Sequence, residues 1–323
     1  PQAFVISASG RSLLVTSSEP SQCLADRVQT YTAYTINRLL SRASMHAELA
    51  AMASAAAARV PGPVGIELES VTAAVAESLE GRPKTNLTPA LMEMRRRKDP
   101  DEIDSIRATI AITEAGYAAV RKKIAPGMTE YEAHTIIYEA MVDKAGTSVE
   151  LHGDFACGTR VPKEGGSPTR RKVKDGDLFI LDLFPIFEGY VCDLTRTFAA
   201  GKPTALQQQA WSHIQEAHAL AQKLIRPGVA CREVYEQVRA HLEKFEPARG
   251  SFYHHAGHGI GMDGWEYPWL TPGSGQTIQE GEVLACEPGL YSEGLSGGIR
   301  LEHNYLVGKD GITALDSFPM ELR

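Results

Sequence analysis

Apolar residues recur at helical spacing in two stretches of the later part of the chain. From Pro100 to residue 125, apolar side chains return every three or four positions, which predicts a helix with one apolar face. Pro126-Gly127 is expected to end this helix, and Thr129 with Glu132 forms the capping-box pattern that starts another. The same order returns later: a helix is predicted over 204–226, a Pro-Gly pair ends it, and a further helix follows.

Each of these helix pairs is followed by a short apolar run that ends on a carboxylate. The first is Asp175-Gly-Asp-Leu-Phe-Ile-Leu-Asp182, and the second is Glu280-Gly-Glu-Val-Leu-Ala-Cys-Glu287. Short apolar runs of this kind predict buried strands, where an ionised carboxylate is costly unless it is paired or bound to a cation. The repeated order of helices and strands predicts one α+β unit that has been duplicated.

A second acid follows each motif on a returning strand. Glu188-Gly189 is a hairpin turn that brings Asp193 beside Asp182, and a glycine-rich turn does the same for Glu302 beside Glu287. If the two halves pack about a pseudo-twofold axis, four carboxylates meet, and their repulsion raises their pKa values unless cations are bound. Oxygen-rich donors suit Mn²⁺, Fe²⁺, Co²⁺ or Zn²⁺, and a pair of such ions can activate a water for hydrolysis.

A histidine-rich loop offers a nitrogen ligand to the same site. His254-His-Ala-Gly-His-Gly-Ile-Gly261 holds three histidines among glycines, which let the backbone approach a ligand closely. We interpret His258 as the ligand, because histidine is the commonest metal ligand and the acids need a partner. The alternative is a structural cation site without turnover.

These motifs resemble those of the pita-bread metallopeptidases, which include methionine aminopeptidase, prolidase and aminopeptidase P, with creatinase as a relative that lacks the metal site. The resemblance covers residues 95–323, and it implies a pita-bread catalytic domain at 96–323 with an internal pseudo-twofold repeat. Residues 1–95 resemble the smaller α/β N-terminal domain of the prolidase, aminopeptidase P and creatinase branch, and its first segment is expected to be missing. The five metal ligands of the family match Asp182, Asp193, His258, Glu287 and Glu302.

The resemblance implies hydrolysis of Xaa-Pro dipeptides, or of short peptides with proline second, by a water that two divalent ions activate. Manganese is favoured over cobalt, iron and zinc. Asp193 and Glu302 are expected to bridge the ions, and Glu287 to pass a proton to the leaving nitrogen. His254 is expected to orient the substrate, and Arg300 to bind a substrate carboxylate. The alternatives are simple packing for His254 and an internal salt bridge for Arg300.

Two positions depart from the pattern of the family. Histidines that hold substrate in relatives are replaced by Gly165 and Trp265. We expect Trp265, with Tyr267 and Trp269, to border the site, either as a packed cluster or as an aromatic wall for an apolar, ring-bearing or cationic ligand. These departures leave two other functions open. One is action on a small osmolyte-like molecule, by ectoine-type amide hydrolysis or sulfonium lyase chemistry, and the other is metal binding without turnover.

The composition of the chain mainly excludes classes of protein and of partner. A chain of 323 residues favours two domains. The net charge of −7, without a basic run, argues against a nucleic-acid partner, and the sequence has no apolar stretch near the ~20 residues of a membrane span. Five scattered cysteines indicate no disulfide framework and favour a reducing compartment, so a cytoplasmic protein is expected. The family resemblance also implies that the protein forms a homodimer.

The first 95 residues show no candidate chemistry. A β-hairpin is predicted over 3–16 around Ser9-Gly10, followed by helices near 21–40 and over 43–59. A strand is predicted over 64–68 and a helix over 71–79.

Overall fold

The computed structural model describes residues 1–59, 62–161 and 165–322. Two units divide the chain, Pro1–Met92 and Glu93–Arg323, and each is described by itself.

Among its described residues the first unit holds a three-stranded sheet, two separate strand pairs and the helices α1 and α2, and α3 begins in it. The predicted hairpin is confirmed, because strands β1 and β2 pair antiparallel and Gly10 takes a φ of 82° in the turn between them. Strand β3 then pairs parallel with β2, and helix α1 buries Leu49 and Ala53 in the core of this unit. The elements are β1 (Ala3–Ile6), β2 (Ser12–Thr16), β3 (Arg27–Thr30), β4 (Tyr34–Thr35), β5 (Arg38–Leu39), α1 (Arg42–Ala57), β6 (Val64–Ile66), α2 (Ala73–Ser78), β7 (Lys84–Asn86) and α3 (Thr88–Arg95).

The helix predicted near residues 21–40 is wrong. That stretch contains the short strands β3, β4 and β5. Its residues 27–35 are rich in threonine, tyrosine and valine, which fit a pleated surface better than a helix. Tyr34 and Leu39 are exposed, so the stretch also lacks the buried apolar stripe that stabilises an amphipathic helix.

The two helices whose bounds were predicted, from Pro100 to residue 125 and over 204–226, are confirmed within a few residues, and a further helix follows each of them as expected. Glu102 accepts a hydrogen bond from the backbone N–H of Asp99 at 2.8 Å, which caps the first of them. The capping box at the next helix is confirmed in both directions, with Thr129 and Glu132 each bonding the backbone of the other at 2.7 and 3.1 Å. These helices are α4 (Pro100–Arg121), α5 (Glu130–Ala145), α6 (Ala205–Leu224) and α7 (Cys231–Leu242).

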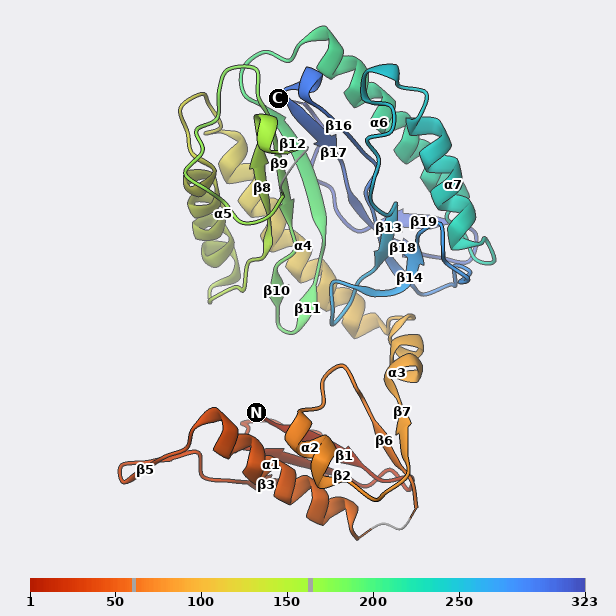
Figure 1. Cartoon of the computed structure of the whole chain (residues 1–323). Helices are drawn as coiled ribbons and strands as arrows, with labels where there is room; N and C mark the ends of the chain where they lie inside the picture. The colour runs from red at the N-terminus through yellow and green to blue at the C-terminus, as the bar shows by residue number, and fades with distance from the viewer. Residues whose placement is uncertain (60–61, 162–164, 323) are drawn as a thin grey trace. The chain divides into compact units, whose positions relative to one another are not determined.

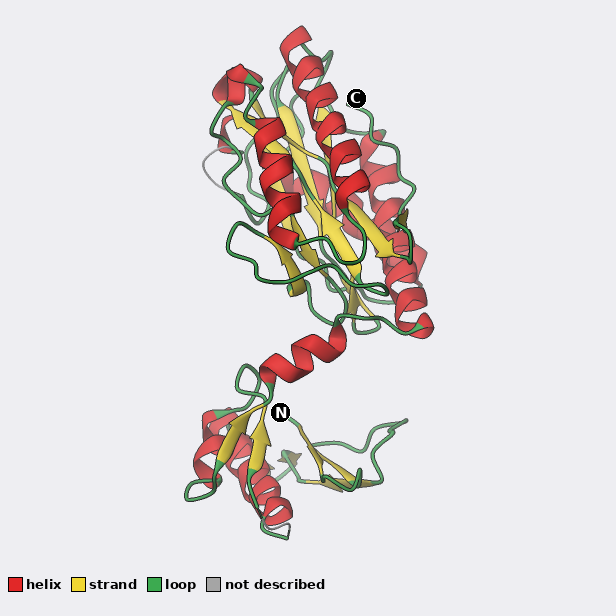
Figure 2. Ribbon diagram, turned by 90° about the vertical axis from the view of Figure 1, so that its right-hand side faces the viewer, coloured by secondary structure: helices red, strands yellow, loops and turns green. Residues whose placement is uncertain are grey.

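The strands of this unit form two main antiparallel sheets with the helices along their outside (Figure 1, Figure 2). The order is β12-β9-β8 in one sheet and β14-β13-β15-β18-β19 in the other, and β10-β11 and β16-β17 form separate hairpins. The bounds are β8 (Gly153–Cys157), β9 (Leu178–Leu183), β10 (Ile186–Phe187), β11 (Tyr190–Val191), β12 (Leu194–Ala199), β13 (Gly257–Gly259), β14 (Glu266–Leu270), β15 (Val283–Cys286), β16 (Gly289–Ser292), β17 (Gly297–Arg300), β18 (His303–Val307) and β19 (Ile312–Ala314).

The two sheets repeat one arrangement. Strand β9 lies between β8 and β12, and β15 lies between β13 and β18 in the same way. Asp182 lies near the end of β9, and Glu287 directly follows β15. Asp193 directly precedes β12, and Glu302 directly precedes β18. The duplicated acidic motif therefore places its carboxylates at matching positions of two matching sheets, in an α+β fold of the pita-bread type.

Two buried ion pairs anchor the start of the second unit to its second sheet. Arg96 donates to Glu282 at 2.6 Å, and Lys98 donates to Glu266 at 2.7 Å. Glu266 also accepts the backbone N–H groups of Met262 and Asp263 at 3.0 and 3.2 Å. Because a buried charge is stable only when it is paired, these contacts fix the loop that follows β13.

Candidate metal centre

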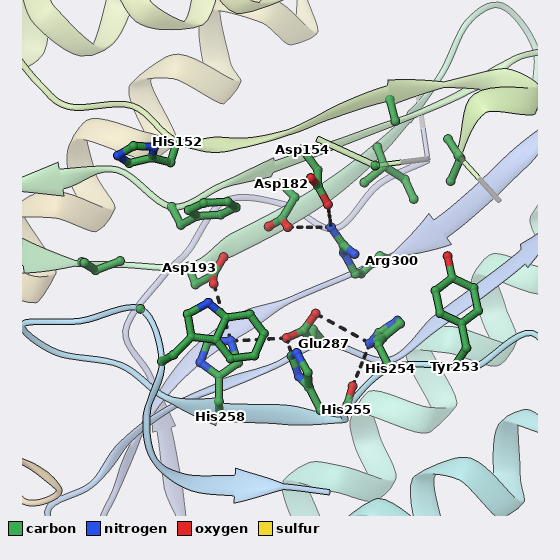
Figure 3. A pocket seen from close by; sticks show the side chains of 18 of the residues that line it. His152, Asp154, Asp182, Asp193, Tyr253, His254, His255, His258, Glu287 and Arg300 are labelled. Atoms are coloured by element: carbon green, nitrogen blue, oxygen red, sulfur yellow. Dashed lines mark hydrogen bonds and ion pairs between the residues drawn. The ribbon is translucent and has the colours of Figure 1, made fainter. Parts of the chain in front are cut away.

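The five predicted metal ligands lie together at the strand ends of the two sheets. Asp182, His258, Glu287 and Glu302 are buried, and Asp193 is partly exposed. A pocket of about 580 Å³ opens onto four of them, and Glu302 lies beside Asp193 and His258 without lining that pocket. Figure 3 shows Asp182 and Asp193 facing His258 and Glu287 across the pocket.

Three of these residues form a close group. One donor atom each from Asp193, His258 and Glu302 lies within 4.8 Å of the other two. His258 Nε2 is 3.6 Å from Asp193 Oδ2 and 3.4 Å from Glu287 Oε1. Asp193 Oδ1 and Glu302 Oε1 are buried and have no hydrogen-bond partner among the described residues. Buried acceptors are normally satisfied, so these two oxygens fit a cation, and the oxygen-rich donor set suits a divalent metal ion.

The pKa values of the carboxyl groups favour a bound cation. Burial raises the pKa of Asp193 well above its ordinary value, and the charge of Glu302 raises it further. Burial and the charge of Glu287 likewise raise the pKa of Glu302, and burial raises that of Asp182. A cation bound between these groups would relieve both the desolvation cost and the repulsion.

Glu287 differs from the other acids. Its burial favours a raised pKa, but contacts with His255 and His258 outweigh this and hold the pKa well below its ordinary value. The pKa of His258 responds in the opposite direction, because Glu287 outweighs the lowering effect of burial and raises it. Glu287 therefore stays ionised, whereas burial disfavours the charged forms of Asp182, Asp193 and Glu302.

Thr195 joins the two sheets and was not singled out from the sequence. Its hydroxyl lies 2.8 Å from Asp182 Oδ1 and 2.8 Å from Glu302 Oε2, and it accepts a hydrogen bond from Arg300 Nε at 3.2 Å. A hydroxyl has one proton, so it donates to one carboxylate at a time. Its position two residues after Asp193, on the same face of the chain, is the sequence signal that could have found it.

Both nitrogens of His254 are engaged by the protein. Nδ1 donates to the backbone carbonyl of His255 at 2.7 Å, and Nε2 accepts from the hydroxyl of Tyr291 at 2.7 Å. Burial lowers the pKa of His254 to about 4, so the ring is neutral. This environment holds His254 in one orientation beside Glu287, whose Oε2 lies 3.9 Å from Nδ1.

His255 is the histidine of this loop that the sequence interpretation left without a role. Its Nδ1 lies 3.1 Å from Glu287 Oε1, at an angle that leaves this nitrogen buried without a hydrogen bond. The ring meets His258 edge-on at 5.0–5.1 Å, as it does Trp265. The pocket lining also includes His152, which had no predicted role.

Arg300 makes internal ion pairs. It donates to Asp182 Oδ2 at 2.5 Å and to Asp154 Oδ2 at 3.1 Å, as Figure 3 shows. Burial opposes the charge of Arg300, but Asp182 outweighs it and raises the pKa of the guanidinium well above its ordinary value. Asp154 was not singled out from the sequence. It lines the pocket together with Arg300.

Both departures from the family pattern border the pocket. A Cβ added at Gly165 would lie 3.0 Å from Asp154 Oδ2, so the missing side chain leaves room for that carboxylate. Trp265 stacks on His258 with 5.0 Å between ring centroids and 14° between planes. Tyr267 and Trp269 pack against each other in β14 and are not in the pocket lining.

Comparison with known proteins agrees with the class that the fold and site define, a metal-dependent hydrolase of the pita-bread type. The model of metallopeptidase family M24 matches residues 104–309. The chain belongs to metallopeptidase family M24, whose members use divalent metal ions.

Named relatives are similar over most of the chain. It is 32% identical over 238 residues to "Probable dipeptidase PepE" of Mycobacterium tuberculosis, covering 73% of this chain and 62% of that protein. It is 27% identical over 233 residues to "Xaa-Pro dipeptidase" of Pyrococcus horikoshii, covering 72% of this chain and 66% of that protein. The matches thus span about two thirds or less of each relative's length.

A solved structure shares the fold across the chain. The Xaa-Pro dipeptidase from Bacillus anthracis matches with a TM-score of 0.84 at 22% identity, covering 100% of this chain and 88% of that one. Among the described residues, none of the helices has the length and apolar character needed to span a membrane.

Proposed function

We propose that this protein is a metal-dependent peptidase that hydrolyses the bond before proline in Xaa-Pro dipeptides or in short peptides with proline second. The observation that carries the proposal is the pair of buried, unpartnered oxygens of Asp193 and Glu302 beside His258. Relatives named Xaa-Pro dipeptidase and dipeptidase support the substrate class.

Asp182, Asp193, His258, Glu287 and Glu302 are the residues proposed to hold two divalent ions. When bound, such ions supply a water nucleophile at neutral pH and polarise the scissile carbonyl. Manganese is the favoured ion, because four of the five ligands are carboxylates and only one is an imidazole.

The side chains around the site take separate roles in this proposal. Glu287 accepts the proton of the attacking water on a carboxylate oxygen and passes it to the leaving nitrogen. His254, fixed by Tyr291 and by a backbone carbonyl, keeps that side of the pocket in one shape. His255 positions Glu287 through the contact of Nδ1 with Oε1 at 3.1 Å. Trp265 covers His258 and limits the access of water.

The ion pairs of Arg300 bear on the length of the substrate. A dipeptide carries its free carboxylate directly after proline, and Arg300, which lines the pocket, is already paired with Asp154 and Asp182. Arg300 is therefore proposed to orient Asp182 for metal binding. A tripeptide, whose carboxylate lies one residue further out, fits this arrangement at least as well as a dipeptide.

The remaining expectations are proposals of the same kind. A cytoplasmic location is supported by the four buried, unpaired cysteines and the exposed fifth. A homodimer, and the assignment of residues 1–95 to the N-terminal domain of the prolidase branch, rest on the family resemblance.

The test is metal reconstitution with a discriminating substrate panel. The metal-free protein is reloaded with Mn²⁺, Co²⁺, Fe²⁺ or Zn²⁺ and assayed with Ala-Pro, Ala-Pro-amide, a tripeptide Xaa-Pro-Xaa and Met-Ala. Turnover of the proline substrates, and not of Met-Ala, is expected. Metal binding without turnover of any substrate would contradict the proposal.

A second candidate is action on a small cationic or osmolyte-like molecule. The observation that favours it is the combination of Asp154 and the exposed face of Trp265 at the pocket, since carboxylates and aromatic faces attract cations. An ectoine-type amide and a sulfonium compound in the same assay distinguish the two functions. Turnover of these compounds alone would replace the peptidase proposal.

A further inference from the structure

A second group of metal-binding side chains lies on helices α6 and α7, and it shares no residue with the pocket described above. The rings of His213 on α6 and His241 on α7 stack with centroids 4.2 Å apart and 18° between planes. Nε2 of His213 is 2.9 Å from the backbone carbonyl of His241, and Nε2 of His241 is 3.3 Å from that of His213. The two rings therefore face each other across the helix pair in a fixed arrangement.

Glu216 completes the group from the next turn of α6. Its Oε2 is 3.5 Å from His241 Nε2 and 3.9 Å from His213 Nδ1. One donor atom from each of the three residues lies within 4.8 Å of the other two. The two contacts of Glu216 are longer than good hydrogen bonds. An ion that sits about 2.0–2.2 Å from nitrogen and oxygen donors fits between them after small side-chain movements.

The charges of the group favour a cation over a simple ion pair. Burial lowers the pKa of His241, and the neighbouring His213 lowers it further, so the ring is neutral at neutral pH. Two protonated rings stacked face to face would repel each other. A divalent ion that replaces the hydrogen bond of His241 Nε2 to the backbone carbonyl of His213 takes that nitrogen as a ligand and neutralises the nearby carboxylate of Glu216.

The surroundings of His213 match those of a metal-bound histidine. Its Nε2–H donates to a backbone carbonyl, which directs the Nδ1 lone pair toward Glu216. Such a bond to the second nitrogen is the usual support of a histidine ligand. Phe245 packs against His213 with 5.5 Å between ring centroids. An open depression lined by Gln208, Ser212 and Glu216 gives an ion access from solvent.

We propose that His213, Glu216 and His241 form an additional metal site for an ion that accepts imidazole nitrogen, namely Zn²⁺, Co²⁺, Ni²⁺ or Cu²⁺. Two imidazoles and one carboxylate suit these ions better than Mg²⁺ or Ca²⁺. The bound ion joins α6 to α7, and it keeps at least one coordination position for water or for an outside group. The proposal does not depend on the peptidase function.

The test counts bound ions in the full-length protein. Zn²⁺ is measured after equilibrium dialysis, and the visible absorption of bound Co²⁺ reports the ligand geometry. The variant H213Q/H241Q is expected to bind one equivalent fewer than the unchanged protein, whereas the control His134→Gln, another half-buried histidine on a helix, binds the same number. The double variant D193N/E302Q is expected to keep this extra equivalent.

A milder variant guards against loss of folding. Glu216 is two-thirds exposed, so Glu216→Gln keeps the helix packing and is expected to weaken this one equivalent of Zn²⁺ by about tenfold or more. Equal zinc stoichiometry in H213Q/H241Q and the unchanged protein would overturn the proposal. So would an unchanged zinc affinity in Glu216→Gln, or loss of the extra equivalent in D193N/E302Q.

Discussion

The two halves of the second unit place their carboxylates alike and surround them differently. In the first half, Asp182 is held by the hydroxyl of Thr195 and by Arg300. In the second half, the matching Glu287 lies among three histidines, with contacts of 3.1–3.9 Å to each. The pKa of Asp182 is raised by burial, and that of Glu287 is held low by His255 and His258.

This difference shows how two copies of one backbone arrangement can give their carboxylates different pKa values. The strand order fixes where the acids lie, because β9 and β15 are the central strands of equivalent sheets. The neighbouring side chains then decide which carboxylate carries a proton at a given pH. A symmetric backbone thus supports an asymmetric site, in which the histidine-rich half keeps Glu287 ionised.

The largest effect is expected from neutralising the acid of the histidine-rich half. Glu287→Gln should lower kcat by about 10³-fold, within the range of lost acid–base catalysis, while some metal remains bound. The matched control is Glu280→Gln, an exposed acid at the start of the same motif, which should leave kcat unchanged. A Glu287→Gln variant with normal kcat would assign the proton transfer to another group.

Metal removal tests whether repulsion among the acids is relieved by a cation. Chelation should lower the Tm of the unchanged protein, because an ion at 100 times its Kd stabilises the folded state by about 2.7 kcal/mol. The shift should be smaller in Asp193→Asn, which removes one of the repelling charges. Differential scanning calorimetry with and without Mn²⁺ measures both, and equal shifts in the two proteins would contradict the cation site.

An intermediate effect is expected at the histidine that distinguishes the halves most. His255→Gln removes the nitrogen next to Glu287 Oε1 and should lower kcat by about 10–100-fold, as for other residues that position a functional group. Its KM should change less than its kcat. His152→Gln is the control, because His152 lines the pocket but hydrogen-bonds to Glu150 at 2.8 Å. Equal effects in both variants would show that His255 only lines the pocket.

The smallest effect concerns the arginine that pairs with the acid of the first half. Arg300→Lys keeps a positive charge near Asp182 but cannot hold Asp182 and Thr195 with two separate nitrogens, so metal affinity should fall by about tenfold. The ratio of kcat/KM for Ala-Pro to that for Ala-Pro-amide should stay the same. If that ratio falls instead, Arg300 binds the substrate carboxylate, and its internal pairing is not its main role.

The repeat and its acids could be predicted from the sequence because both are local patterns. Apolar runs ending on Asp182 and Glu287 are readable as strands, and the capping box at Thr129 is readable as a helix start. The stretch near 21–40 was misread in part because strand β3 has its partner outside the stretch. Strand β3 pairs with β2 across a connection of ten residues, and such pairing leaves little trace in a local window.

The sequence alone therefore determined the family and predicted the five ligand positions. Only the tertiary structure decided the partners of those positions: that Arg300 meets Asp154, that both nitrogens of His254 are engaged, and that His255 faces Glu287. The physical reason is that spacing along the chain fixes which element carries a residue and on which face. Burial, pairing and charge depend on what the rest of the chain packs against that face.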